Sequence, residues 1–127
     1  MLADFYQVLI VHPDPLLRFS AAQWLRARAI RSTLVGTPAE AIHVLRQRPI
    51  DLVAVTLSDT DTGWFNFAHT IAAMPHAPAV AVGSDLTLPS WLTPGIQPHV
   101  VARVRPPADY VELARLVDTT LELRLVA

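Results

Sequence analysis

Residues 6–18 read Y-Q-V-L-I-V-H-P-D-P-L-L-R, and this stretch combines a strand, a turn and the start of a helix. Its first part, 6–11, is apolar and rich in residues that favour strands, which is typical of a strand buried on both faces. Asp14 followed by Pro15 predicts a helix start, because aspartate caps a first turn and proline is tolerated at the first helical position. A buried strand that passes directly into a helix indicates an α/β fold.

The same pattern recurs along the chain. We expect further strands at residues 31–35, 51–56, 79–82 and 100–104, and helices at 15–28, 38–48, 64–74 and 108–125. Segment 85–97 contains Pro89, Pro94 and Gly95, which leave room only for a shortened or irregular fourth helix. Five apolar strands that alternate with helices predict a five-stranded parallel sheet with helices on both faces and right-handed crossovers.

Composition limits the classes of function. The 127 residues suffice for one domain with a single core, and the formal net charge of −1 argues against nucleic-acid binding. The chain has no cysteine, which excludes disulfides and thiolate metal sites and fits a reducing compartment. No signal-peptide pattern opens the sequence, and no apolar run approaches the ~20 residues of a membrane helix. We therefore expect a cytoplasmic domain without membrane insertion.

Several short motifs resemble, in order and spacing, those of response-regulator receiver domains. V-L-I-V-x-x-D-P-L-L-R at residues 8–18 is similar to the first strand and helix of that family, and D-L-V-A-V-x-L at 51–57 is similar to its third strand. D-x-G at 61–63, P-A-V-A-V at 78–82 and V-R-P-P at 104–107 resemble later motifs. The resemblance covers nearly the whole chain and implies one domain over residues 1–127 with a flavodoxin-like, receiver-type fold.

The resemblance also implies where a phosphorylation pocket would lie. In working receivers, a carboxylate pair after the first strand binds Mg²⁺, and an aspartate after the third strand accepts the phosphoryl group. A Thr or Ser after the fourth strand and a Lys after the fifth contact that group. In this chain the matching positions and their neighbours are His12, Pro13 and Asp14, then Thr56, then Gly83 and Ser84, and finally Arg105 and Pro106.

None of the five functional positions keeps the residue type that the family's chemistry needs. His12 is a poor Mg²⁺ ligand, Pro13 offers no side-chain ligand, and Thr56 has no carboxylate to phosphorylate. Gly83 has no hydroxyl, and Arg105 replaces the lysine. The sequence therefore predicts a vestigial pocket, a pseudo-receiver, with no catalysis, no metal and no cofactor.

Other interpretations of these residues stay open. His12 with Asp14 or Asp59 is a conceivable transition-metal site, although an isolated polar histidine is commoner. D-T-D-T-G at 59–63 is partly similar to a calcium loop, but it lacks the later acidic ligands, so a turn is favoured. Thr56 is a poor kinase substrate if buried. Arg105 is expected either to pair with Asp14, Asp59 or Asp61 or to remain solvated.

The last predicted helix carries an apolar stripe and a polar side. On a helical wheel the stripe expected to pack on the sheet consists of Tyr110, Leu113, Ala114, Val117 and Leu121. Leu116 and Leu123 lie seven residues apart near the polar side. This spacing predicts a helix-mediated contact, unless the two are isolated surface leucines.

These observations predict a non-catalytic receiver-like signalling or scaffold module within a larger bacterial regulator. It would act by phosphorylation-independent dimerisation, or by binding a partner signalling protein through the last helix. Two alternatives remain. One is a receiver that is still phosphorylated at an unusual site such as Asp59, and the other is a small-anion sensor that uses the pocket of His12, Thr56, Gly83 and Arg105.

Overall fold

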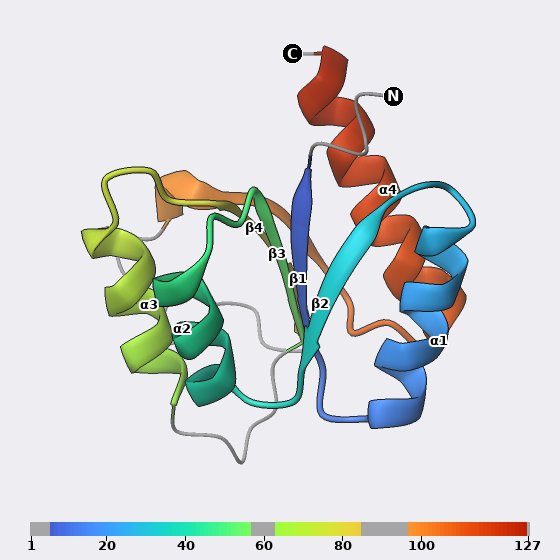
Figure 1. Ribbon diagram of the computed structural model, residues 1–127, viewed down its shortest axis with the longest axis horizontal. Coiled ribbons are helices and arrows are strands. Elements are labelled where there is room, and N and C mark those ends of the chain that lie inside the picture. The colour runs from blue at the N-terminus through green and yellow to red at the C-terminus, as the bar shows by residue number, and fades with distance from the viewer. Residues whose placement is uncertain (1–5, 57–62, 85–96, 127) are drawn as a thin grey trace.

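The computed structural model describes residues 6–56, 63–84 and 97–126, with side chains up to Glu122 (Figure 1). Five strands form one parallel sheet in the order β2-β1-β3-β4-β5: β1 (Gln7–Val11), β2 (Arg31–Val35), β3 (Leu52–Thr56), β4 (Ala79–Gly83) and β5 (Val100–Val104). The helices are α1 (Pro15–Arg26), α2 (Pro38–Gln47), α3 (Trp64–Ala73) and α4 (Tyr110–Val126), with a 3₁₀ turn η2 (Gln97–His99) before β5. The flavodoxin-like fold prediction is confirmed.

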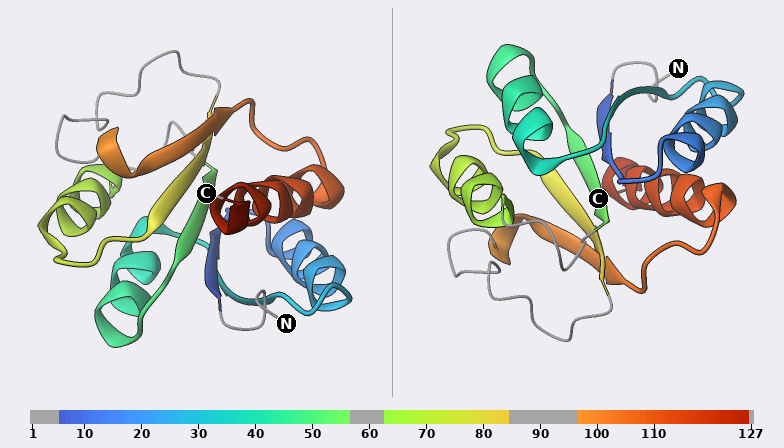
Figure 2. Two further views of the ribbon diagram at one scale, coloured as in Figure 1. Left: turned by 90° about the horizontal axis from the view of Figure 1, so that it is seen from above. Right: turned by 90° about the horizontal axis from the view of Figure 1, so that it is seen from below.

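Helices cover the two faces of the sheet in pairs (Figures 1 and 2). α2 and α3 pack together on one face, while α1 and α4 pack together on the other. The larger core, under α2 and α3, includes Phe67, Ile71 and Leu9, and the core under α1 and α4 includes Leu25 and Leu113. No described helix is both long enough and apolar enough to cross a membrane.

Three helices have a capping residue before their first turn, and the first of these, Asp14, was predicted from the sequence. Asp14 Oδ1 accepts hydrogen bonds from the N–H groups of Leu16 and Leu17 at 3.0 and 3.4 Å, and Thr37 Oγ1 accepts one from the N–H of Glu40 at 3.2 Å. Before α4, Asp109 Oδ1 accepts from the N–H of Glu112 at 2.9 Å. These acceptors satisfy first-turn N–H groups that have no partner within their helix.

The edge strand β5 departs from the expectation of full burial. None of its five residues is buried, and the side chains of Val101 and Val104 are 43% and 42% exposed. An apolar sequence alone does not distinguish a central strand from an edge strand, because only the central one has neighbours on both sides. The central strands β3 and β4 are buried along their whole length, as expected.

The wheel for the last helix was correct for four residues and wrong for Tyr110. Leu113, Ala114, Val117 and Leu121 are buried, but Tyr110, the first residue of the helix, is 43% exposed. Leu116 was placed near the polar side, yet it is half-buried and packs against the core under α1 and α4. The side chain of Leu123 and the expected irregular helix within 85–96 lie outside the described residues.

Candidate functional site

The positions that the sequence singled out lie at the carboxyl ends of adjacent strands. Val11 of β1 pairs with Val55 of β3, and Thr56 pairs with Gly83 of β4. His12 directly follows Val11, and Thr56 directly follows Val55. His12, Thr56 and Gly83 therefore occupy the ends of neighbouring strands. In sheets of this kind ligands bind beyond the carboxyl ends of the strands, so this is where a functional site is expected.

At the end of β1, hydrogen bonds within the turn already use the polar groups. The buried His12 accepts a hydrogen bond at Nδ1 from the N–H of Asp14 at 3.0 Å, and its backbone N–H donates to the carbonyl of Val35 at 3.1 Å. Burial lowers the pKa of His12, the nearby Asp14 carboxylate opposes this, and the Arg18 guanidinium adds to it. Because Nδ1 accepts a hydrogen bond, it carries no proton, and the imidazole ring is neutral in this arrangement.

Arg18 places a positive charge beside the same turn. Its Nη1 donates to the carbonyl oxygen of His12 at 2.9 Å and lies 3.1 Å from the point where a Cβ on Gly36 would stand. The Asp14 carboxylate is the one acidic group of the turn, and its Oδ1 caps α1. This donor set does not fit Mg²⁺, which requires hard oxygen ligands and local negative charge.

Thr56 ends β3 as a buried hydroxyl. Its side chain is 8% exposed, and within the described part of the chain its Oγ1 has no hydrogen-bond partner. A hydroxyl in this position is a weak nucleophile unless a base activates it. His12, which follows β1 on the neighbouring strand, has its Nδ1 occupied by the Asp14 N–H. Thr56 is thus closed off from solvent rather than presented to a substrate.

The end of β4 lies against the backbone that follows β5. A Cβ built on Gly83 would stand 3.0 Å from Cδ of Pro107, 3.4 Å from Cα of Pro106 and 3.6 Å from the carbonyl oxygen of Arg105. The neighbouring N–H of Ser84 donates to the carbonyl of Val104 at 3.0 Å. Segment 105–107 therefore covers the position at which receivers carry a hydroxyl side chain, and a glycine is what fits beneath it.

Arg105 is exposed and makes no ion pair with Asp14, the described member of its expected partners. It instead lines a hollow of about 380 Å³ together with residues of α4 and the end of β5. Asp59 and Asp61, and with them the whole 59–63 loop apart from Gly63, lie outside the described residues. Among the described residues, no three His, Asp or Glu side chains come together to hold a metal ion.

Searches with this sequence matched no protein-family model and no curated protein. Solved structures, by contrast, match over almost the full chain. A response-regulator receiver domain from Methanospirillum hungatei superposes with a TM-score of 0.72 at 18% identity, covering 92% of this chain and 94% of that one. The chain has the receiver fold.

Two further likenesses agree with this assignment. A receiver domain from Methylobacillus flagellatus gives a TM-score of 0.65 at 17% identity, covering 90% of this chain and 97% of that one. An orphan response regulator of H. pylori gives 0.70 at 15% identity, covering 93% and 98%. Identities this low establish the shape of the receiver fold and leave the chemistry of its pocket to the residues present.

Sequence reasoning missed two contributors to this site, Arg18 and Pro107. Arg18 lies on α1, outside the strand ends that the resemblance maps, and its contact with the His12 carbonyl depends on how α1 packs beside β2. Pro107 carried a signal in the sequence, because two consecutive prolines after a strand stiffen the backbone where it leaves the sheet.

Proposed function

We propose that this chain is a pseudo-receiver, a signalling or scaffold module with the receiver fold that acts without taking phosphate. The observation that carries the proposal is the close approach of segment 105–107 to Gly83, which leaves little room for a Cβ at the position of a phosphate-contacting side chain. The capping role of Asp14 and the neutral, buried Thr56 support it. The site residues His12, Pro13, Asp14, Thr56, Gly83, Ser84, Arg105 and Pro106 are then structural remnants of a phosphorylation pocket.

Phosphoryl transfer to a receiver needs a carboxylate nucleophile and cations that neutralise the transferring group. Thr56 supplies no carboxylate, and the Arg18 guanidinium lies next to the turn at which a divalent cation would bind. Arg105 is an exposed side chain that lines the α4 hollow. A module of this kind signals through its binding to particular partner proteins, and its phosphorylation state plays no part.

The contact surface that we favour for self-association lies between β5 and α4. Apolar side chains of β5 and the start of α4 are exposed there, namely Val101, Val104 and Tyr110. Of these, Val104 lines the hollow of the β5 end and α4, together with Pro107 and Leu116 among others. Leu116, which the wheel placed near the polar side, thus contributes a wall of this hollow. One solved structure with the same fold is of a histidine kinase in complex with a response regulator, so binding of a partner signalling protein is the alternative to self-association.

Intact-mass measurement after incubation with acetyl phosphate and Mg²⁺ tests the phosphate-independent part. A receiver that autophosphorylates serves as positive control, and a Thr56→Asp variant serves as matched control. We expect no phosphoryl adduct on either form of this chain, because restoring the acceptor does not restore the metal ligands. An adduct on the unmodified chain, at Asp59 or elsewhere, would overturn the proposal.

Sedimentation velocity tests the association part. We expect wild-type protein at ~100 µM to contain dimer, in the range of transient contacts, and Val104→Glu to shift it to monomer. Leu16→Glu, at an exposed position in the first turn of α1 outside this surface, is the matched control and should leave the dimer intact. A monomeric wild type would exclude self-association through this surface.

A further inference from the structure

The outer edge of β2 is the second place where the chain presents unused polar groups. β2 is an edge strand and pairs only with β1 among the described strands. The carbonyl of Val35 faces β1, where it accepts from the N–H of His12. Because N–H and C=O groups alternate in direction along a strand, those of Ser32 and Leu34 face outward.

This outward stretch is bounded at both ends. The N–H of Ile30 donates to the carbonyl of Leu25 at 3.0 Å, which ties the start of the strand to the end of α1. The N–H of Gly36 donates to Oε2 of Glu40 at 3.2 Å, which closes the other end. Between them, the two N–H and two C=O groups of Ser32 and Leu34 form a template for one short added strand.

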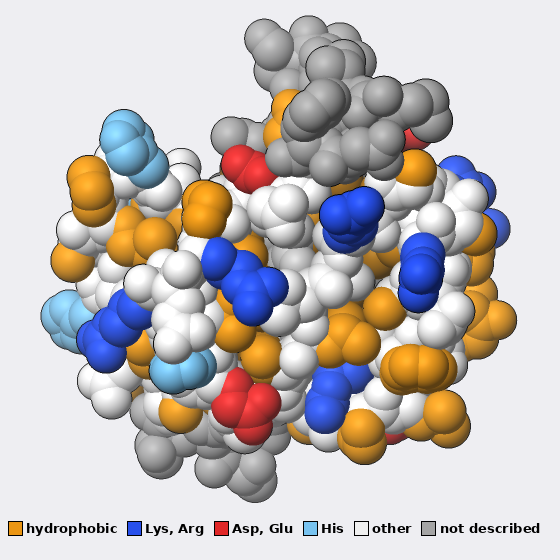
Figure 3. Space-filling model, viewed as in Figure 1, with side chains coloured by type: hydrophobic (Ala, Val, Ile, Leu, Met, Phe, Trp, Pro, Cys, Tyr) orange, Lys and Arg blue, Asp and Glu red, His pale blue; other side chains and the backbone are white. Residues whose placement is uncertain are grey.

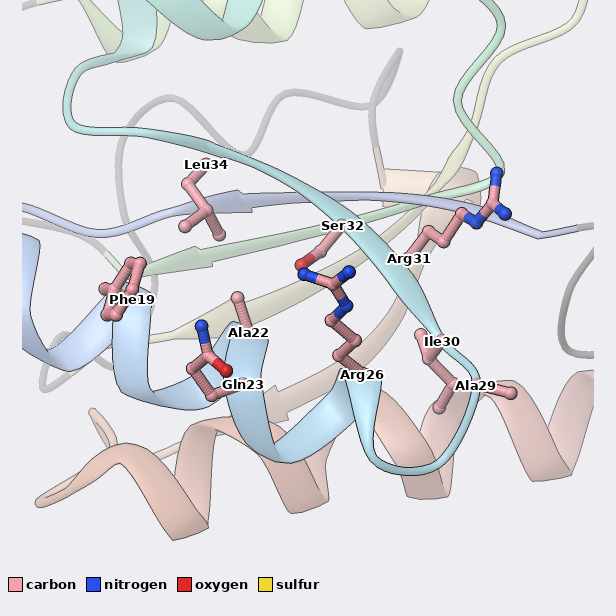
Figure 4. Close-up of a pocket in the computed structure, with 9 residues that line it drawn as sticks. All are labelled: Phe19, Ala22, Gln23, Arg26, Ala29, Ile30, Arg31, Ser32 and Leu34. Atoms are coloured by element: carbon pink, nitrogen blue, oxygen red, sulfur yellow. The ribbon is translucent and has the colours of Figure 1, made fainter.

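A hollow of about 640 Å³ lies beside this edge, between α1 and β2. In Figure 4, Phe19, Ala22, Gln23 and Arg26 line it from α1, and Ser32 and Leu34 face it from β2. Arg26 reaches across toward Ser32, whereas Arg31 points away from the hollow. The lining is apolar at the Phe19 and Leu34 end, and it is basic and hydrogen-bonding at the Arg26 and Ser32 end.

The charged residues that α1 and β2 place around the hollow are all basic. Between Pro15 and Ala39 the sequence has arginines at 18, 26, 28 and 31 and no acidic residue. Arg18 is held by the His12 carbonyl, and Arg28 stacks on Trp24 at 4.0 Å and pairs with Asp118 at 3.0 Å. Arg26 makes no ion pair with any described residue, and its side chain is exposed. Figure 3 shows blue and orange side chains interleaved over α1 and β2.

We propose that β2 receives an extended acidic segment of a partner protein as an added strand, with one apolar side chain over Phe19 and Leu34 and one carboxylate on Arg26. Side chains two residues apart share a face of a strand, which matches the spacing from Leu34 to Ser32 along the edge. A second copy is a poor occupant, because pairing β2 with β2 would bring two arginine-bordered edges together. This surface lies across the sheet from β5, and its use does not depend on the state of the phosphorylation pocket.

The probe is an acetylated, amidated peptide, Val-Glu-Leu-Thr-Glu-Thr-Val, titrated into ¹⁵N-labelled full-length protein and followed by NMR. It places leucine and glutamate two residues apart on one face. A control of equal composition, Val-Glu-Leu-Glu-Thr-Thr-Val, moves that glutamate to the opposite face. A second control carries N-methyl groups at alternate amides, on the edge that would pair with β2.

We expect saturable shifts of the Ser32 and Leu34 amides and of α1, with Kd on the order of 0.1–1 mM for so small a contact. Arg26→Glu should weaken binding at least tenfold and Arg26→Gln less, while Arg115→Glu on α4 should leave it unchanged. The rearranged and N-methylated peptides should bind at least fivefold more weakly. No shift at ~5 mM peptide, equal binding of the N-methylated peptide, or shifts confined to α4 would each overturn strand addition at β2. Circular dichroism of both Arg26 variants confirms that the fold is retained.

Discussion

The carboxyl ends of the central strands and the outer edge of β2 use their polar groups in opposite ways. At the strand ends, the Asp14 carboxylate caps α1, the His12 ring accepts the Asp14 N–H, and the Gly83 position is covered by Pro107. At the edge, the main-chain groups of Ser32 and Leu34 face outward beside a basic hollow. Internal contacts therefore use the polar groups at the strand ends, whereas those of Ser32 and Leu34 face outward at the edge of the sheet.

The largest effect is expected from adding a side chain at Gly83. Gly83→Ala should lower the free energy of unfolding by about 1–3 kcal/mol, because the new Cβ meets a proline ring and backbone rather than the end of a flexible side chain. Gly83→Thr, which restores the family's residue type, should lower it further. Urea denaturation followed by circular dichroism measures both.

Gly36→Ala is the matched control for this contact. A Cβ there meets the Nη1 end of the flexible Arg18 side chain at 3.1 Å, which can move aside. We expect the free energy of unfolding to change by less than about 1 kcal/mol in either direction, since alanine loses less backbone entropy on folding than glycine does. Equal destabilisation by the two alanine variants would show that segment 105–107 does not close the β4 end.

A smaller effect distinguishes a capping role of Asp14 from a ligand role. Asp14→Ala should lower the free energy of unfolding by about 0.5–2 kcal/mol, because the N–H groups of Leu16 and Leu17 lose their acceptor. Asp14→Asn keeps a capping oxygen and should remain within about 0.5 kcal/mol of wild type. If the asparagine variant lost as much as the alanine variant, the negative charge rather than the cap would be essential.

A substitution in the turn between α1 and β2, at one end of the hollow, is expected to raise the stability of the protein. Ala29 has φ 64°, in the left-handed region that disfavours residues with a Cβ. Ala29→Gly relieves this strain and should raise the free energy of unfolding by about 0.5–1 kcal/mol, after the entropy lost by glycine is deducted. A thermal melt detects the gain, and an unchanged or lower midpoint would show that Ala29 is unstrained.

The smallest effect concerns the protonation of His12. Burial lowers its pKa in the folded protein, so the unfolded chain binds the proton more readily. The His12 contribution to stability is therefore present above pH ~6.5, the unfolded value, and is lost as the pH falls toward the folded pKa. His12→Asn should flatten this part of the stability curve between pH 7.5 and 5. The expectation fails if wild type and variant lose stability in parallel, because the loss would then not come from His12.

The sequence was enough to predict the sheet, because apolar strands and capped helices repeat at regular intervals from 6 to 125. Leu113, Ala114 and Val117 were predicted to be buried for the same reason. Val101 and Val104 were not predicted to be exposed, since exposure at a sheet edge depends on which strand has no outer neighbour. The exposure of Tyr110, at the start of α4, was not predicted either. The candidate positions from His12 to Arg105 were located by resemblance. The contacts of Arg18 and Pro107 depend on packing between distant segments, which no local pattern encodes.

Titration of ¹⁵N-labelled protein with Mg²⁺, first alone and then with beryllofluoride, tests the central claim. The claim is that the polar groups at the strand ends are used in internal contacts and form no Mg²⁺ site. With the carboxylate ligands absent, Asp14 committed to its helix and Arg18 beside the turn, we predict no saturable shift of the amides at 12–14, 56 and 83–84 up to ~10 mM Mg²⁺, well above the range of a specific site. Adding beryllofluoride should cause no further shift of these amides. Saturable shifts at those amides at sub-millimolar Mg²⁺, extended by beryllofluoride, would contradict the account and identify a working receiver pocket.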